Sequence, residues 1–341
     1  IRALFNFEWS KYNSLNIGTS LRNQNIREQY DSLGIVKNEW MPGIFIENTY
    51  QFKTKLAFIT GIRADQLNGA NFITPRANIK YNFSEFSTLR ASIGTGFRTS
   101  NILAENPALL PSNRKIIIIG PLAPEQSLNY GLNYVHEFKI DYRQASIGFD
   151  LYRTDFSNKI IPDYESNLQA VIFQNLKGKA YANNLQVDLS WKVLKPLTFR
   201  FSYKYLDVKN TINGIEQAQL YTAKNRTLTT LFYESLNKKW NINFVWQWYG
   251  QKRLPKVDSY HASHESIAFN DYSIPYSVFN IQLTRRWKHW EVYTGVDNIL
   301  DFRQTTHILS ADDPYGKHFD SSYVWGPLEG RKIYTGFRYI R

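Results

Sequence analysis

The sequence predicts an all-β chain whose antiparallel strands form a transmembrane β-barrel. Three observations predict it: apolar and polar residues alternate, connections alternate in length, and aromatic residues gather at strand ends. In NLQVDLSW (184–191) the odd positions are apolar and the even positions polar, which is the period of a β-strand. No long stretch of helical period occurs, and the alternation recurs at 89–97, 128–134, 144–151, 197–205 and 240–248.

The connections give the second observation. Short turns are expected near 83–85, 138–142, 194–196, 235–239 and 287–289, and long links near 23–39, 99–125, 154–178, 209–224, 251–275 and 299–330. After residue 83, short and long connections take turns along the chain. Outer-membrane barrels follow this rule, because their periplasmic turns are short and their extracellular loops are long. Strands of about ten residues also suit a tilted crossing of the bilayer.

The third observation is the aromatic content, which is 16% of residues. Trp and Tyr lie towards strand ends on the apolar faces, and lipid–water interfaces favour these residues. The set comprises Trp191, Tyr203, Tyr205, Trp240, Trp246, Trp248, Trp287 and Trp290. A soluble β-protein with an aromatic core is the alternative, but it does not explain the connection lengths. We therefore expect the apolar faces to meet lipid and the polar faces to line a lumen.

The composition excludes several classes of protein. With 21% charged and 43% apolar residues the chain is neither disordered nor built of membrane helices. Without cysteine it has no disulfide, no thiolate metal site and no cysteine nucleophile. The net charge is +12, but Lys and Arg are spread along the chain and not concentrated as nucleic-acid binding requires. Anionic lipid, or an anionic ligand guided by lumen arginines such as Arg200, could account for the charge.

The strand count bears on the extent of the barrel. The alternation gives about 15 strands in a single barrel domain over residues 1–341, with no separate second domain. The last strand, 331–341, follows a long link, so the C-terminus is expected on the periplasmic side. Bacterial single-chain barrels have an even number of strands, whereas an odd count places residue 1 on the outer side. We therefore expect the C-terminal portion of a larger barrel.

Two segments resemble a known family. RASIGTGFRTSNILAENPALLPSNRK (90–115) and LAPEQSLNYGLNYVHEF (122–138) resemble the mid-barrel signature of TonB-dependent outer-membrane transporters. In that family a strand ending in Gly-Phe-Arg leads to a long loop, and a Pro-Glu-x-Ser-x-x-Tyr-like stretch opens the next strand. Here that stretch is Pro124, Glu125, Ser127 and Tyr130. Segments 72–83, 295–304 and 313–341 resemble further strands of the family in the same order.

The resemblance implies a fold and a function. It implies a 22-stranded barrel with a plugged lumen in the outer membrane of a gram-negative bacterium, surrounded by outer-membrane lipid and lipopolysaccharide. It also implies a transporter, not an enzyme, whose loops bind a scarce siderophore, cobalamin, haem or oligosaccharide before the TonB complex drives release. No cofactor and no nucleic acid is expected. Two departures are that the chain ends at Arg341, not at an aromatic residue, and that no segment resembles the plug domain or the TonB box.

Two alternatives to an energised transporter remain open. A passive 16-stranded porin would fit about 340 residues, and large steady conductance would identify it. A structural barrel subunit of an outer-membrane complex would co-purify with a partner, such as a surface lipoprotein or another outer-membrane subunit, without any ligand.

Individual residues with chemical potential lie mostly in the long links. Tyr260, His261 and His264 form a candidate ligand-binding group, although their spacing lacks the helical frame of a zinc site, and a solvated loop is the simpler interpretation. The glycines of GTGFRT (94–99) are interpreted as small lumen-facing residues, because a phosphate loop requires a third glycine and a helix. The isoleucines of KIIIIGP (115–121) are interpreted as a strand within a loop.

Overall fold

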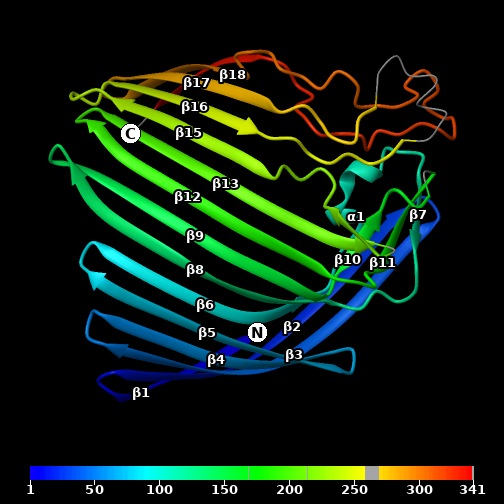
Figure 1. Cartoon of the computed structure of the whole chain (residues 1–341), viewed down its shortest axis with the longest axis horizontal. Coiled ribbons are helices and arrows are strands. Elements are labelled where there is room, and N and C mark those ends of the chain that lie inside the picture. Colours follow the sequence, from blue (N-terminus) through cyan, green and yellow to red (C-terminus); the bar gives the residue numbers. More distant parts are fainter. Residues whose placement is uncertain (168, 213, 258–268, 340–341) are drawn as a thin grey trace.

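The computed structural model describes residues 1–167, 169–212, 214–257 and 269–339, most of them in one large sheet (Figure 1). This sheet holds 16 strands, of which fifteen follow one path of antiparallel neighbours, and this confirms the expected count. The path runs through β1 (Arg2–Ser10), β2 (Asn13–Tyr30), β3 (Leu33–Phe52), β4 (Leu56–Leu67), β5 (Ala70–Ser84), β6 (Ser87–Arg98), β8 (Glu125–Ile140), β9 (Arg143–Asn158), β12 (Ala180–Leu194), β13 (Leu197–Ile212), β15 (Asn225–Glu234), β16 (Trp240–Tyr249), β17 (Tyr276–Arg286), β18 (Trp290–Asp297) and β19 (Lys332–Tyr339). The sixteenth strand, β14 (Ile215–Ala218), pairs only with β13.

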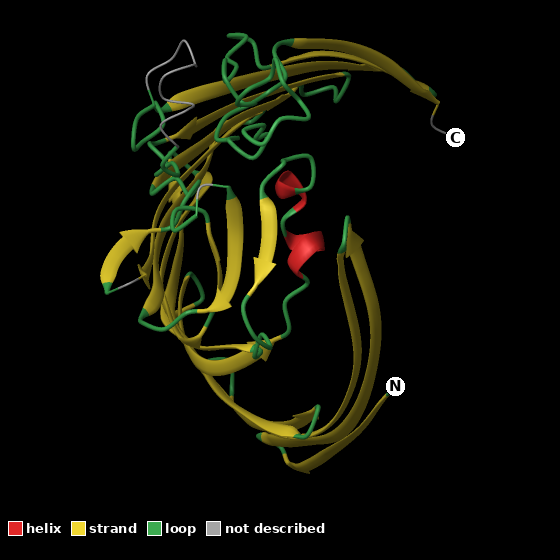
Figure 2. Cartoon of the chain, turned by 90° about the vertical axis from the view of Figure 1, so that its right-hand side faces the viewer, coloured by secondary structure: helices red, strands yellow, loops and turns green. Residues whose placement is uncertain are grey.

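The sheet curves into an open arc. Figure 2 shows the strands following the wall of a trough, with the first and last strands, β1 and β19, at its open side. The path of neighbours begins at β1 and ends at β19, and these two do not pair with each other among the described strands. Within the described part of the chain, no helix is long and apolar enough to cross a membrane.

The two faces of the sheet differ as the alternation predicts. In β12, Leu189 lies opposite Ile147 of β9 and Phe201 of β13, so apolar side chains form one continuous surface. On the other face Asp188 accepts a hydrogen bond from Gln186 Nε2 at 2.9 Å. In the neighbouring strands, the polar side chains that pair in register with Asp188 lie on the same face of the sheet. This polar face is the concave side of the arc.

The connections confirm the predicted rule after residue 83. Short turns occur at 85–86, 141–142, 195–196, 235–239 and 287–289, and long links at 99–124, 159–179, 213–224, 250–275 and 298–331. All long links leave the sheet at one end, here called the loop end, and all these short turns lie at the opposite turn end (Figure 1).

The long link expected near 23–39 was wrong. Strands β2 and β3 continue through this segment and join in a tight turn at Asp31 and Ser32, where Asp31 has a φ of 50°. Residues such as Arg27, Glu28 and Asn38 make both faces of this part polar. Alternation disappears where neither face meets lipid, although the backbone still satisfies its hydrogen bonds by pairing. The sequence pattern therefore missed a strand that continues beyond the apolar belt.

The aromatic residues lie at both ends of the apolar face. In β16, Trp240 lies at the turn end, whereas Trp246 and Trp248 lie at the loop end. The guanidinium of Arg285 lies 4.3 Å from the centroid of the Trp240 ring and 5.5 Å from that of Trp287. A basic head group on an aromatic ring at a strand end is typical of a residue at the membrane interface.

Candidate functional site at the loop end

Two long links fold back into the arc and form a small second layer, here called the loop platform. It comprises α1 (Ile102–Glu105), η1 (Pro107–Leu109), β7 (Lys115–Ile118), β10 (Ile160–Asp163) and β11 (Ala170–Asn175). Strand β11 lies between the other two, antiparallel to β10 and parallel to β7. Figure 2 shows the platform within the outline of the arc and Figure 1 places it at the loop end, so these links fold over the mouth of the arc.

The platform has its own apolar core. Val171 and Phe173 of β11 are almost fully buried with Ile102 of α1 and Leu109 of η1. Alternate residues of β7, among them Ile116, pack against this core. The isoleucine run is thus a strand within a loop, as expected, and burial of its apolar side chains stabilises the link.

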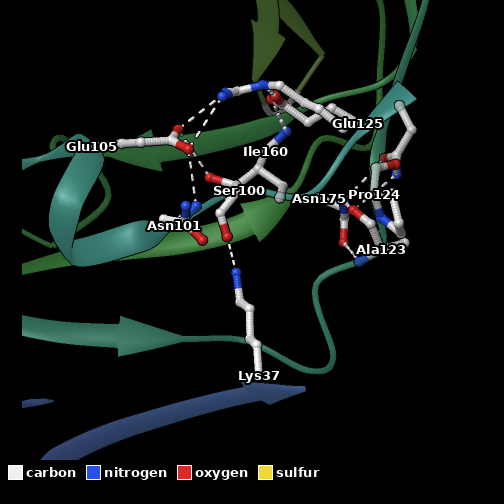
Figure 3. A network of polar contacts seen from close by, with 11 residues as sticks. Lys37, Ser100, Asn101, Glu105, Ala123, Pro124, Glu125, Ile160 and Asn175 are labelled. Carbon is white, nitrogen blue, oxygen red and sulfur yellow. Dashed lines mark hydrogen bonds and ion pairs between the residues drawn. The ribbon is translucent and has the colours of Figure 1, made fainter. Parts of the chain in front are cut away.

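An ion-paired arginine joins the platform to the wall. Arg98, the last residue of β6, lies opposite Glu125, the first residue of β8. Its Nε donates to Glu125 at 2.6 Å, and its terminal nitrogens donate to both oxygens of Glu105 in α1 at 3.1 Å. Glu125 also accepts the backbone N–H of Ile160 at 3.0 Å, and Glu105 accepts that of Asn101 at 2.9 Å (Figure 3). The two motif segments around residues 98 and 125 therefore meet and fix both ends of the 99–124 link.

The tip of the β2–β3 hairpin holds the same link from the other side. Glu28 accepts the N–H of Ala104 at 2.8 Å, and Glu39 accepts the hydroxyl of Thr99 at 3.0 Å. Lys37 donates to the carbonyl oxygen of Ser100 (Figure 3). Both carboxylates are buried, so water does not compete with their hydrogen bonds, which hold Thr99 and α1 against the hairpin.

The last long link completes the assembly. Asp320 accepts a hydrogen bond from Ser112 at 3.0 Å and lies 3.6 Å from the Nε of Arg114. Arg114, which is buried, also donates to the carbonyl oxygen of Tyr164 at 3.0 Å. Links 99–124, 159–179 and 298–331 therefore meet around one buried ion pair.

A cavity of about 290 Å³ lies between the platform and the β13–β14 extension. Its polar lining includes Lys159, whose ammonium donates to Asn210 at 2.9 Å and to Gln219 at 3.1 Å. Burial lowers the pKa of Lys159, and the charge of Glu125 partly opposes this. The ammonium of Lys159 thus bonds only to neutral amides, and burial destabilises its charge. An oxygen atom of a ligand that enters the cavity would stabilise this charge.

Two tyrosines and an ion pair form another part of the cavity wall. Burial raises the pKa of Tyr164 to about 12 and that of Tyr221 well above its ordinary value, so both phenols stay protonated. The hydroxyl of Tyr221 is buried and has no hydrogen-bond partner among the described residues. Arg253 pairs with Glu165. The cavity therefore offers phenol and ammonium donors to a ligand.

The ligand-binding residues predicted from the sequence are not among the described residues that line the cavity. Tyr260, His261 and His264 lie outside the described residues. Lys159, Tyr221 and Arg253 were missed, because they are scattered over three links and follow no local pattern. Arg98 and Glu125 were marked by the motifs, but their pairing was not expected. Among the described residues, no group of three His, Cys, Asp or Glu is arranged to hold a metal ion.

Sequence comparison decides the family. The profile described as TonB dependent receptor-like, beta-barrel matches residues 1–299. The chain belongs to this TonB-dependent receptor family. The ferric enterobactin receptor of Pseudomonas aeruginosa is 25% identical over 288 residues, which are 76% of this chain and 37% of that receptor. A second receptor of that organism, PirA, is 24% identical over 243 residues, covering 62% and 30%.

Several solved receptors and a transporter share the fold. A ferric enterobactin receptor (PfeA) of P. aeruginosa superposes with a TM-score of 0.70 at 20% identity, covering 98% of this chain and 52% of the receptor. The siderophore receptor PirA of Acinetobacter baumannii gives 0.69 at 17%, covering 99% and 53%. The copper transporter OprC gives 0.70 at 17%, covering 98% and 55%. The chain thus spans about half the length of these proteins, which are receptors and a transporter.

Proposed function

We propose that this chain is the ligand-capturing wall and loop assembly of a TonB-dependent transporter that imports a ferric siderophore across the outer membrane of a gram-negative bacterium. The observation that carries the proposal is that the long links fold inward onto a platform and line a polar cavity. The names of the relatives support a siderophore, since three of those described above are siderophore receptors.

The proposed mechanism follows from the contacts. A ligand entering from outside meets the cavity, where Lys159 and the phenols of Tyr164 and Tyr221 donate to its oxygens. Arg98, Glu105 and Glu125 join the cavity to the barrel wall. Binding of the ligand in the cavity therefore acts on the ends of β6 and β8. By family membership, a plug in the lumen and the TonB complex would then complete import. The barrel domain is proposed to extend over residues 1–341.

Uptake by the full-length protein tests this proposal. Cells that lack their own siderophore receptors and produce the protein should accumulate radiolabelled iron from a ferric tris-catecholate, and deletion of TonB should abolish the uptake. Lys159→Gln should weaken binding of the complex about tenfold, as expected for losing a charged hydrogen bond. Lys177→Gln is the matched control, because Lys177 is an exposed lysine of the same link.

Other results would support the alternatives. Large steady channels from the purified protein in planar bilayers would identify a passive porin. Recovery of a stoichiometric outer-membrane partner without any uptake would identify a structural subunit. Uptake that is independent of TonB would refute the proposed transporter.

A further inference from the structure

The apolar outer face ends, at the turn end of β16 and β17, in a patch where one cation lies among aromatic rings. Arg285 lies opposite Trp240 across the two strands, and Trp287 is the first residue after β17. The guanidinium of Arg285 lies 4.3 Å from the ring centroid of Trp240 and 5.5 Å from that of Trp287. Ile281 and Leu283 share its face of the strand and are exposed. We call Arg285, Trp240 and Trp287 the arginine patch.

The guanidinium of the patch has no oxygen acceptor. Arginine carries five N–H donors, yet no hydrogen bond or ion pair is found for Arg285 within the described residues. The next residue, on the polar face, is different: Arg286 donates to Glu291 at 2.7 Å and to Glu234 at 3.4 Å. A cation–π contact gives an N–H donor no oxygen partner, so the donors of Arg285 remain available to an external anion.

Another arginine of the outer face shows what the patch lacks. Arg153 shares the outer face of β9 with the exposed Leu151 and lies towards the loop end, with its guanidinium 4.4 Å from the centroid of the Tyr181 ring. Here the strand also supplies a carboxylate, because Arg153 donates to Asp155 at 2.7 Å. Both arginines thus contact an aromatic ring, but only the one at the loop end has an anion from its own chain.

Three lysines in the adjoining turns add to the charge of the patch. Lys238 and Lys239 precede β16, and Lys288 follows Trp287. All three are exposed, and their ammonium groups have no ion pair in the part of the chain that the structure describes. The backbone N–H of Arg286 donates to the carbonyl oxygen of Lys239 at 2.8 Å, so the two turns are neighbours. Unpaired cations therefore gather at the level where aromatic residues mark the membrane interface.

An apolar surface continues from the patch along the strands. Val292 of β18 lies opposite Arg285, and Phe337 of β19 lies opposite Val292. Both are exposed, as are Leu283 and Ile281. An occupant that fits must combine anionic oxygens at the level of Arg285 with apolar chains that extend towards the loop end. A phospholipid has both parts, and the short turns of an outer-membrane barrel lie at the periplasmic leaflet, which consists of phospholipid.

We propose that the arginine patch is a binding site for the phosphate group of an anionic phospholipid in the periplasmic leaflet. The guanidinium of Arg285 donates to the phosphate oxygens, and the two indole rings hold it at the interface. Lys238, Lys239 and Lys288 favour a head group with net negative charge over a zwitterionic one. The acyl chains lie along the apolar surface. The site is independent of the imported cargo and requires only that the apolar face meets lipid.

Lipid titration of the full-length protein in detergent, followed by native mass spectrometry, tests the site. The probes are phosphatidylglycerol, which has a net negative charge, phosphatidylcholine with the same acyl chains, and inorganic phosphate. The protein should bind its first phosphatidylglycerol about tenfold more tightly than phosphatidylcholine, and Arg285→Gln should remove this preference, as for losing a charged hydrogen bond. Arg153→Gln is the matched control, because it removes an outer-face arginine that already has a carboxylate, and it should leave the preference unchanged.

Two further variants keep Arg285 in place. Lys288→Gln should weaken phosphatidylglycerol binding about twofold, since an exposed charge contributes little. Trp287→Leu keeps every charge and should weaken it about threefold, because the guanidinium loses one of its two rings. These two variants decide the outcome if Arg285→Gln does not fold. The unfolding temperature without added lipid should be the same in all variants that fold.

Several results would overturn the proposal. Equal affinity of the unaltered protein for the two lipids would do so, as would equal losses in Arg285→Gln and Arg153→Gln, which would show a response to net charge alone. Inorganic phosphate that displaces phosphatidylglycerol at equal concentration would identify an ion site and not a lipid site. A lowered unfolding temperature in Arg285→Gln with unchanged lipid binding would make the arginine a structural residue. Absence of iron uptake would refute the proposed transporter and leave this site untouched.

Discussion

The outer face of β12 allows a depth-resolved test of the membrane arrangement. Trp191 marks the turn-end interface, and Leu185 and Leu189 lie on the same face six and two residues from it. At about 3.3 Å per residue and a tilt of about 40°, Leu185 lies about 15 Å and Leu189 about 5 Å inside that interface. Since the apolar band is about 25 Å tall, Leu185 is close to the bilayer midplane.

An arginine at these positions should therefore have unequal costs. Leu185→Arg should lower the free energy of unfolding by about 2–4 kcal/mol, and Leu189→Arg by about 1 kcal/mol, because the cost falls towards the interface. Asn184→Arg is the matched control: it adds the same charge one residue away, on the polar face, opposite the uncharged Leu206 and Tyr152.

The assay is unfolding in urea of the full-length protein folded into phosphatidylcholine vesicles, followed by tryptophan fluorescence. Equal costs for Leu185→Arg and Asn184→Arg would show that the apolar face does not meet lipid. A larger cost at Leu189 than at Leu185 would refute the depth assignment and the role of Trp191 as the interface marker.

Three further predictions concern the link 99–124, whose mobility can be followed by a spin label at Ala108→Cys, since the chain has no native cysteine. Glu125→Gln should increase the mobility of the label, because Arg98 loses one carboxylate and the buried oxygens lose their charge; unchanged spectra would contradict a role for this pair. Burial raises the pKa of Glu105, but the hydrogen bonds from the Asn101 amide and Arg98 outweigh it, so the pKa is lowered overall. The Glu105 carboxylate therefore stabilises the link fully above the ordinary carboxyl pKa. This stabilisation is lost as the pH falls through the lowered pKa of the folded protein. Glu105→Gln should abolish that acid-induced loosening, and a transition that persists in the variant would assign it to another group. Glu28→Gln should loosen the N-terminal part of the link by about 1 kcal/mol, as for a weakened charged hydrogen bond, measured as faster amide exchange; protection equal to wild type would refute the hairpin contact.

Much of the fold could be read from the sequence because lipid imposes a strict rule on each strand. Every membrane-crossing strand must place apolar residues outward at every second position, so stretches such as 184–191 reveal strand, face and approximate length. The connection lengths after residue 83 then followed from where the alternation stops. The polar hairpin tip at 23–39 does not meet lipid and shows no alternation, so the sequence predicted a loop there.

The candidate site was less predictable for a related reason. Arg98 and Glu125 stand in recognisable motifs, but nothing local shows that they bond to each other across a 26-residue link. Lys159, Tyr221 and Arg253 come together only because three links fold back onto one platform. Likewise, Trp240 and Arg285 lie in different strands, and their contact depends on register.

The sequence alone determined the alternating strands and their two faces, because a period of two in one dimension specifies which side of a strand is apolar. Only the tertiary structure decided which charges meet. Pairing, register and loop docking depend on contacts between residues far apart in the chain, and these fix whether a cation faces a carboxylate, as Arg98 does, or aromatic rings, as Arg285 does.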